Sequence, residues 1–100
     1  MHSVRFRTEV ADDLASARTW YEARSEGLGA EFIGAVDALL ERIARAPLEF
    51  PVVHAGVIRR GHLRRFPFSV FFLKEEQHIV VLAVLHGAVD PRRWTTRTEP

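Results

Sequence analysis

The sequence has no cysteine and only one lysine among its 100 residues. Without cysteine, disulfide bonds and thiolate metal sites are excluded, which suits the reducing cytoplasm where we expect the protein to act. The longest apolar run, Ile79 to Leu85, has seven residues, whereas a membrane-spanning helix needs roughly 20. The first ten residues also lack the apolar segment of a secretory signal. These absences favour a cytoplasmic protein without a membrane segment.

Several kinds of catalytic motif are absent as well. The five histidines do not have the spacing of HExxH, no serine lies in a GxSxG sequence, and the glycines around Leu28 do not form a phosphate-binding loop. The helical acids Asp12, Asp13 and Glu22 are expected to cap helices or face water, because nothing in the sequence desolvates them. We therefore expect neither a metal nor a cofactor.

What the chain does contain is a strongly cationic segment. Arg59, Arg60, Arg64 and Arg65 occur within seven residues and lead into an aromatic, β-prone stretch. Residues 1–50 carry a net charge of −3, from six arginines and nine acids, and residues 51–100 carry +4, from eight basic residues and four acids. Such an asymmetry indicates either a surface that faces a partner or a solvated charged face.

The hydrophobic pattern predicts a single α+β domain over residues 1–100, with the element order β-α-α-β-β-β. A strand over 3–7 precedes a helix that ends at about Arg24, and a second helix follows from Leu28 to Ala46, where Pro47 ends it. The two apolar helix stripes cannot bury themselves on each other alone. We therefore expect a helical hairpin packed on one face of a small antiparallel sheet.

Three further strands are predicted over residues 57–65, 68–73 and 78–86. The stretch at 48–55 is interpreted as irregular because Pro51 interrupts it, and the last strand is almost wholly apolar, which favours a central position in the sheet. A polar tail is expected from about residue 87.

Alternation along the strand at 57–65 predicts that Arg60, His62 and Arg64 share one face. Arg59 and Arg65 then lie on the other. Charged arginine is costly to bury unpaired, so at least two of the four arginines should face solvent or pair across the sheet edge. Clustered arginine suits carboxylate or phosphate recognition. The alternative is pairing within the fold, with Glu22, Glu41 or Glu49.

Two residues near the C-terminus also have open interpretations. His86 ends the last predicted strand, where it is either a base, if a partner lies within hydrogen-bond reach, or a structural hydrogen-bonding group. Trp94, beside Arg92 and Arg93, is suited either to stack on a partner or to pin the tail to the domain.

Motifs along nearly the whole chain, from about Val4 to Arg97, resemble the RelE/ParE superfamily, the toxins of bacterial type II toxin–antitoxin modules. Each motif is weak alone, but their order and spacing together are fairly specific. They are Trp20-Tyr21-Glu22, Gly27-Leu28-Gly29-x-x-Phe32, Pro47 with Phe50-Pro51, Arg59-Arg60 to Arg65-Phe66-Pro67-Phe68, and His86 to Asp90-Pro91-x-x-Trp94-x-x-Arg97.

The resemblance implies a growth-inhibiting toxin, encoded beside a cognate antitoxin that wraps and neutralises it. An acidic, amphipathic antitoxin segment would suit the arginine strand, by adding either a strand or a helix to the exposed surface. The expected antitoxin- or target-binding residues are Arg59, Arg60, Arg64, Arg65, Arg92, Arg93, Trp94 and Arg97.

The superfamily has two main activities. RelE-like members cut mRNA on the ribosome without a metal, with basic residues on the sheet and a tyrosine or histidine near the C-terminus, whereas ParE-like members poison DNA gyrase. Here the only lysine is Lys74, in a loop, and no tyrosine accompanies His86. A ParE-like gyrase inhibitor is therefore favoured. The alternatives are an inactive or differently targeted member, or a RelE-like endonuclease with Arg60, Arg64 and His86 at the scissile phosphate.

Overall fold

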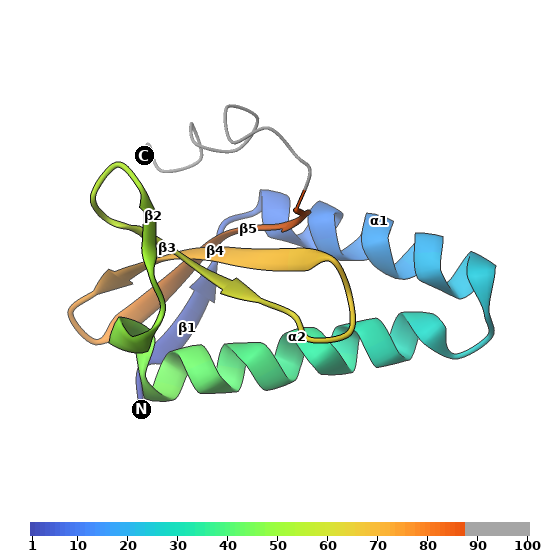
Figure 1. Cartoon of the computed structure of the whole chain (residues 1–100), viewed down its shortest axis with the longest axis horizontal. Helices are drawn as coiled ribbons and strands as arrows, with labels where there is room; N and C mark the ends of the chain where they lie inside the picture. The colour runs from blue at the N-terminus through green and yellow to red at the C-terminus, as the bar shows by residue number, and fades with distance from the viewer. Residues whose placement is uncertain (88–100) are drawn as a thin grey trace.

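The computed structural model describes residues 1–87 and has two helices packed on a five-stranded mixed sheet (Figure 1). This confirms the α+β fold with a helical hairpin on one face of the sheet. The elements in chain order are β1 (Ser3–Phe6), α1 (Glu9–Arg24), α2 (Leu28–Arg45), a 3-10 turn (Pro47–Glu49), β2 (Val52–His54), β3 (Ile58–His62), β4 (Phe68–Glu75) and β5 (His78–His86).

The sheet has one strand more than expected, because β2 forms in the stretch interpreted as irregular. Pro51 lies just before β2, where a missing N–H is tolerated, and its carbonyl accepts a hydrogen bond from the Arg60 N–H at 3.1 Å. The chain then turns back through Ala55 and Gly56, which have φ angles of 51° and 72°. The element order is therefore β-α-α-β-β-β-β.

The sheet is also mixed rather than wholly antiparallel. The strand order is β1-β5-β4-β3-β2, and β1 pairs parallel with β5, whereas the other neighbours are antiparallel. The direction of β1 was not predictable from a turn, because both helices and three strands separate it from β5 in the chain. The central position expected for the apolar strand is only partly met, since β5 is second in the order.

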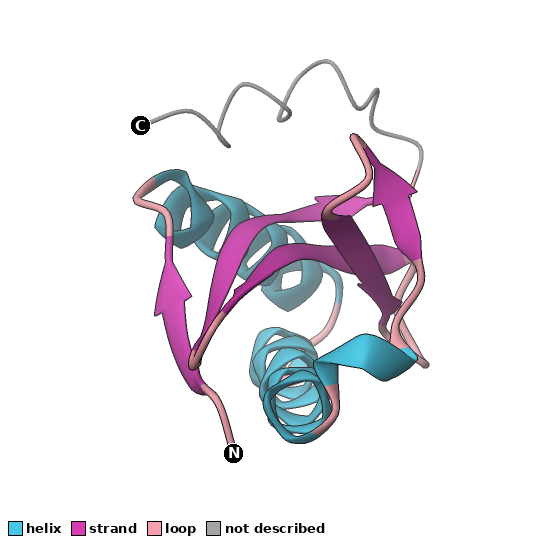
Figure 2. Ribbon diagram, turned by 90° about the vertical axis from the view of Figure 1, so that its left-hand side faces the viewer, coloured by secondary structure: helices cyan, strands magenta, loops and turns pink. Residues whose placement is uncertain are grey.

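The core lies between the helices and the sheet, which curves around them in Figure 2. Each large apolar side chain that is fully buried there stabilises the fold by about 1.5–3 kcal/mol. At one end an aromatic cluster joins the layers, with the Tyr21 and Phe66 ring centroids 4.8 Å apart and those of Phe32 and Phe68 5.1 Å apart. The fully buried large residues of this core are Val10 of α1, Phe32, Val36 and Ile43 of α2, and Val70, Phe72, Ile79, Val81 and Val84 of the sheet.

A β-bulge in β5 ties this strand to α1. Phe71 pairs with Ala83 but the next residue, Phe72, pairs with Val81, so Leu82 is an extra residue in β5. Just after this irregularity, the backbone N–H of Val84 donates to the Asp13 carboxylate at 3.1 Å. Asp13 thus satisfies a backbone donor between two elements.

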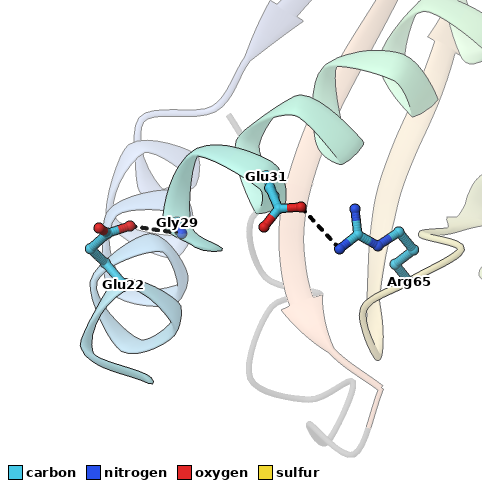
Figure 3. Close-up of polar contacts among 4 residues, drawn as sticks. All are labelled: Glu22, Gly29, Glu31 and Arg65. Atoms are coloured by element: carbon cyan, nitrogen blue, oxygen red, sulfur yellow. Dashed lines mark hydrogen bonds and ion pairs between the residues drawn. The ribbon is translucent and has the colours of Figure 1, made fainter. Parts of the chain in front are cut away.

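The turn between the helices is held by Glu22. Its carboxylate accepts hydrogen bonds from the backbone N–H groups of Gly27 and Gly29, both at 2.9 Å, and Figure 3 shows the second of these. These donors lower the pKa of Glu22. Gly27 has a φ of 86°, a conformation that glycine adopts readily. Among residues 1–87, no helix has the length and apolar character needed to cross a membrane.

Candidate partner-binding surface

The arginine segment is not one continuous strand. β3 ends at His62, and residues 63–67 form a bend that leads into β4. Pro67 cannot donate to a ladder, and the bend is closed instead by bonds from the Leu63 N–H to the Phe68 carbonyl and from the Phe68 N–H to the Phe66 carbonyl. The predicted strand at 57–65 was therefore too long, and Arg64 and Arg65 lie outside the sheet.

The two arginines within β3 are half-buried and belong to opposite faces, as alternation predicted. Arg59 donates from Nη1 to the Phe50 carbonyl at 2.6 Å. Arg60 pairs across the ladder with Phe71 on the outer face, away from the helices, where His62 also lies. The Nε atom of Arg60 is buried, with no hydrogen-bond acceptor among the described residues. The prediction that Arg64 shares this face is wrong, because the chain has already left the strand.

The two arginines of the bend are exposed. Arg65 donates from Nη2 to the Glu31 carboxylate of α2 at 3.2 Å (Figure 3), and the two side chains are 63% and 52% exposed. The expectation that at least two of the four arginines face solvent or form pairs is thus confirmed. The acid is Glu31, however, rather than Glu41, which pairs with Arg45.

A groove of about 490 Å³ separates α2 from this bend, and we call it the α2–bend groove. Its floor and helical wall are small or apolar, and both sides carry arginine. The lining residues are Glu31, Gly34, Ala35, Ala38, Leu39 and Arg42 of α2, and His62, Leu63, Arg64 and Arg65 of the opposite side. The His62 ring itself is held on the outer face of the sheet by a 2.7 Å hydrogen bond between Nδ1 and the hydroxyl of buried Ser69.

A second groove, of about 570 Å³, lies between α1 and the adjoining ends of β4 and β5. Its lining is mainly aromatic and apolar, including Trp20, Tyr21 and Phe68, and Asp12 contributes to it. Burial raises the pKa of Tyr21. The Arg24 guanidinium stacks on the Trp20 ring, 3.7 Å from its centroid. This chemistry suits apolar contact rather than anion binding.

The residues suggested for a nuclease centre come from β3, from the bend and from the end of β5. His86 lines the groove beside α1 and packs edge-on against Phe68, with centroids 5.6 Å apart. Arg64 lines the α2–bend groove, and Arg60 pairs with Phe71 on the outer face. Arg92, Arg93, Trp94 and Arg97 lie outside the described residues. Within residues 1–87 no three His, Asp or Glu side chains are grouped to hold a metal.

Sequence reasoning missed the helical side of the groove. Arg42, Gly34 and Ala38 come from α2, which contributes its apolar stripe to the core and a different strip of its surface to the groove. The signal that was available is Gly34, a glycine in the middle of a helix where alanine is more stable.

Comparisons with known proteins agree with this architecture. The family model described as the ParE toxin of the type II toxin–antitoxin system parDE matches residues 4–91. A solved structure described as the chromosomal ParDE TA system from P. aeruginosa is similar with a TM-score of 0.72 and 20% sequence identity, over 86% of this chain and 96% of that one. At this identity the likeness shows the fold. No curated protein sequence matches the chain.

Proposed function

Because the chain belongs to the ParE toxin family of type II toxin–antitoxin systems, we propose that it arrests growth by inhibiting DNA gyrase and that a cognate antitoxin neutralises it. The family match bears out the resemblance to RelE/ParE toxins.

The observation that carries this proposal is the match to the ParE toxin family over residues 4–91. Metal-free cleavage of RNA needs an acid or base and a cationic group around one phosphate, within hydrogen-bond reach of the reacting atoms. Here Arg60 lies on the outer sheet face, whereas Arg64 lies on the bend and His86 lines the groove beside α1. Arg64 also shares a hollow with Gly87, which follows His86. A toxin that acts by contact with another protein needs an exposed surface instead, and the bend and α2 offer one.

The direct test compares the two targets with one preparation of purified toxin. Supercoiling of relaxed plasmid by gyrase should fall as toxin is added, while a message translated on purified ribosomes should stay intact. Cleavage of the message with unimpaired supercoiling would replace this proposal by the nuclease.

Substitution of His86 separates the same alternatives in cells. His86→Ala should still arrest growth on induction, because a gyrase inhibitor does not need a proton-transfer group there. A nuclease that uses His86 would lose its toxicity. Accumulation of folded His86→Ala protein, checked by circular dichroism, is the control.

The antitoxin is sought in the reading frame beside the toxin gene. Its product should bind the toxin and restore both growth and supercoiling. A DNA-binding protein with an acidic C-terminal segment would fit the arginine-rich surface.

A further inference from the structure

The outer face of the sheet carries a buried apolar cluster, although neither helix lies on that face. Both helices pack on the opposite face (Figure 2), and yet Ile58 of β3 and Leu82 and Ala83 of β5 are each 0% exposed. Four more apolar side chains are partly buried around them. These seven residues, which we call the outer-face cluster, are Ile58, Phe71, Leu73, Val80, Leu82, Ala83 and Leu85.

The sequence of β5 also indicates a sheet that is covered on both faces. An antiparallel sheet with one face in water normally alternates apolar and polar residues along its strands. In β5 every position from Ile79 to Leu85 is apolar, and Val80 and Leu85 belong to the outer-face cluster. The helices cover one face only, so the other face needs a cover from elsewhere.

Arg60 indicates that this cover is partly polar. Arg60 lies on the outer face, and its Nε is buried with no hydrogen-bond acceptor among residues 1–87. A buried donor that lacks an acceptor destabilises a fold, and such donors are rare in native proteins. The segment that covers this face is therefore expected to bring an oxygen acceptor as well as apolar groups.

Residues 88–100 have the reach and the chemistry for this role. The chain leaves the sheet at Gly87, whose N–H donates to the Pro67 carbonyl at 2.9 Å beside the start of β4. Thirteen residues follow, which extend to at most about 45 Å, whereas the nine residues of β5 span about 30 Å. They supply one large aromatic side chain and two carboxylates, from Trp94, Asp90 and Glu99.

The groove beside α1 is the other surface within reach of this segment, because His86 lines it. Trp20, which also lines that groove, is 52% exposed, whereas Leu82 on the outer face is fully buried. The burial of the described residues therefore favours the outer face.

We propose that residues 88–100 dock across the outer face of the sheet, with Trp94 against the outer-face cluster and an oxygen acceptor of the segment at the Nε of Arg60. Trp94 then anchors the end of the chain to the domain, rather than serving as a free contact to a partner. This inference is independent of gyrase and of the antitoxin, because it concerns contacts within one chain.

The test uses the fluorescence of Trp94. The chain has two tryptophans, so the Trp20→Phe variant leaves Trp94 as the only one. In the native state its emission should lie at shorter wavelength than in urea, and acrylamide should quench it at least twofold less. Phe71→Ala and Leu73→Ala, each added to Trp20→Phe, remove part of the outer-face cluster and should raise the quenching constant at least twofold.

Two matched variants in the same background serve as controls. Leu48→Ala removes a large apolar side chain that is 67% exposed and is not part of the cluster, and Ser16→Phe fills the groove beside α1. Both should leave the quenching of Trp94 unchanged. Circular dichroism and thermal unfolding check that every variant is folded, and the two cluster variants give independent readings if one of them is not.

Three outcomes would overturn the proposal. Trp94 that is quenched in the native state as strongly as in urea would show that the segment is not docked. Protection that is lost with Ser16→Phe but kept with Phe71→Ala and Leu73→Ala would place the segment in the groove beside α1. Protection that disappears on dilution would mean that a second copy of the chain covers Trp94. None of these results bears on gyrase inhibition, which the supercoiling assay decides.

Discussion

Arg59 and Arg60 in β3 differ from Arg64 and Arg65 in the bend, although only a few residues separate them. The β3 pair is half-buried, and Arg59 is bound to the Phe50 carbonyl, whereas the bend pair is exposed and holds only a weak ion pair to α2. The backbone causes this difference. In β3 the side chains of Arg59 and Arg60 project to opposite faces of the sheet, where neighbouring side chains half-bury them, whereas the bend leaves Arg64 and Arg65 exposed. A run of arginines therefore divides into half-buried and exposed members where the strand ends.

The packing of β3 can be tested at Gly61, which lies between Arg60 and the bend arginines. A Cβ at Gly61 would lie 3.1 Å from Phe50 Cε1 and 3.2 Å from Leu39 Cδ1. Gly61→Val should therefore lower the free energy of unfolding by about 2–3 kcal/mol through overpacking, as measured by urea denaturation. Gly87→Val is the control, because its Cβ would lie 3.7 Å from the Pro67 carbonyl oxygen. Equal stability of both variants would show that β3 is not tightly packed.

The exposed surface beside the bend can be tested at Gly34 of α2. Gly34→Ala should raise the free energy of unfolding by about 0.5–1 kcal/mol, because alanine is the better helix former and its methyl group meets no neighbour. Urea denaturation measures the change. A loss of stability would mean that the fold itself needs glycine at position 34.

The smallest effect is expected for the ion pair between the bend and α2. A double-mutant cycle with Glu31→Ala and Arg65→Ala should give a coupling free energy below about 0.5 kcal/mol, which salt reduces further. The coupling is small because both side chains are more than half exposed and water weakens the attraction between their charges. A coupling above about 1 kcal/mol would make Arg65 a structural residue, like Arg59.

Much of the fold could be predicted because its signals are local. The helical period marks α1 and α2, Pro47 marks the end of the second helix, and the run from Ile79 to Leu85 marks a buried strand. The parallel pairing of β1 and the bulge at Leu82 depend on residues far apart in the chain. Periodicity carries no information about such pairings.

The candidate site was predicted only in part, because some of its features follow from local sequence and others depend on contacts between distant residues. Exposed arginines were expected from the cost of burying charge, and Arg64 and Arg65 are exposed. The difference between these two residues and Arg59 and Arg60 could not be predicted, because it depends on where β3 ends. Glu31 was missed as the partner of Arg65 because it lies 34 residues away in sequence. The α2 side of the groove, with Gly34 and Arg42, could not be predicted, because it depends on how α2 packs beside the bend.

The central claim is that the bend arginines serve the partner and the β3 arginines serve the fold. Two double variants test it most directly, Arg64→Ala/Arg65→Ala and Arg59→Ala/Arg60→Ala, each measured by thermal unfolding and by titration with the antitoxin. The bend variant should keep the wild-type Tm and bind at least tenfold more weakly, about 1.4 kcal/mol. The β3 variant should lose about 1–3 kcal/mol of stability, because the Phe50 carbonyl loses its donor. A bend variant that binds as tightly as the wild type, beside a β3 variant of unchanged stability, would contradict the account.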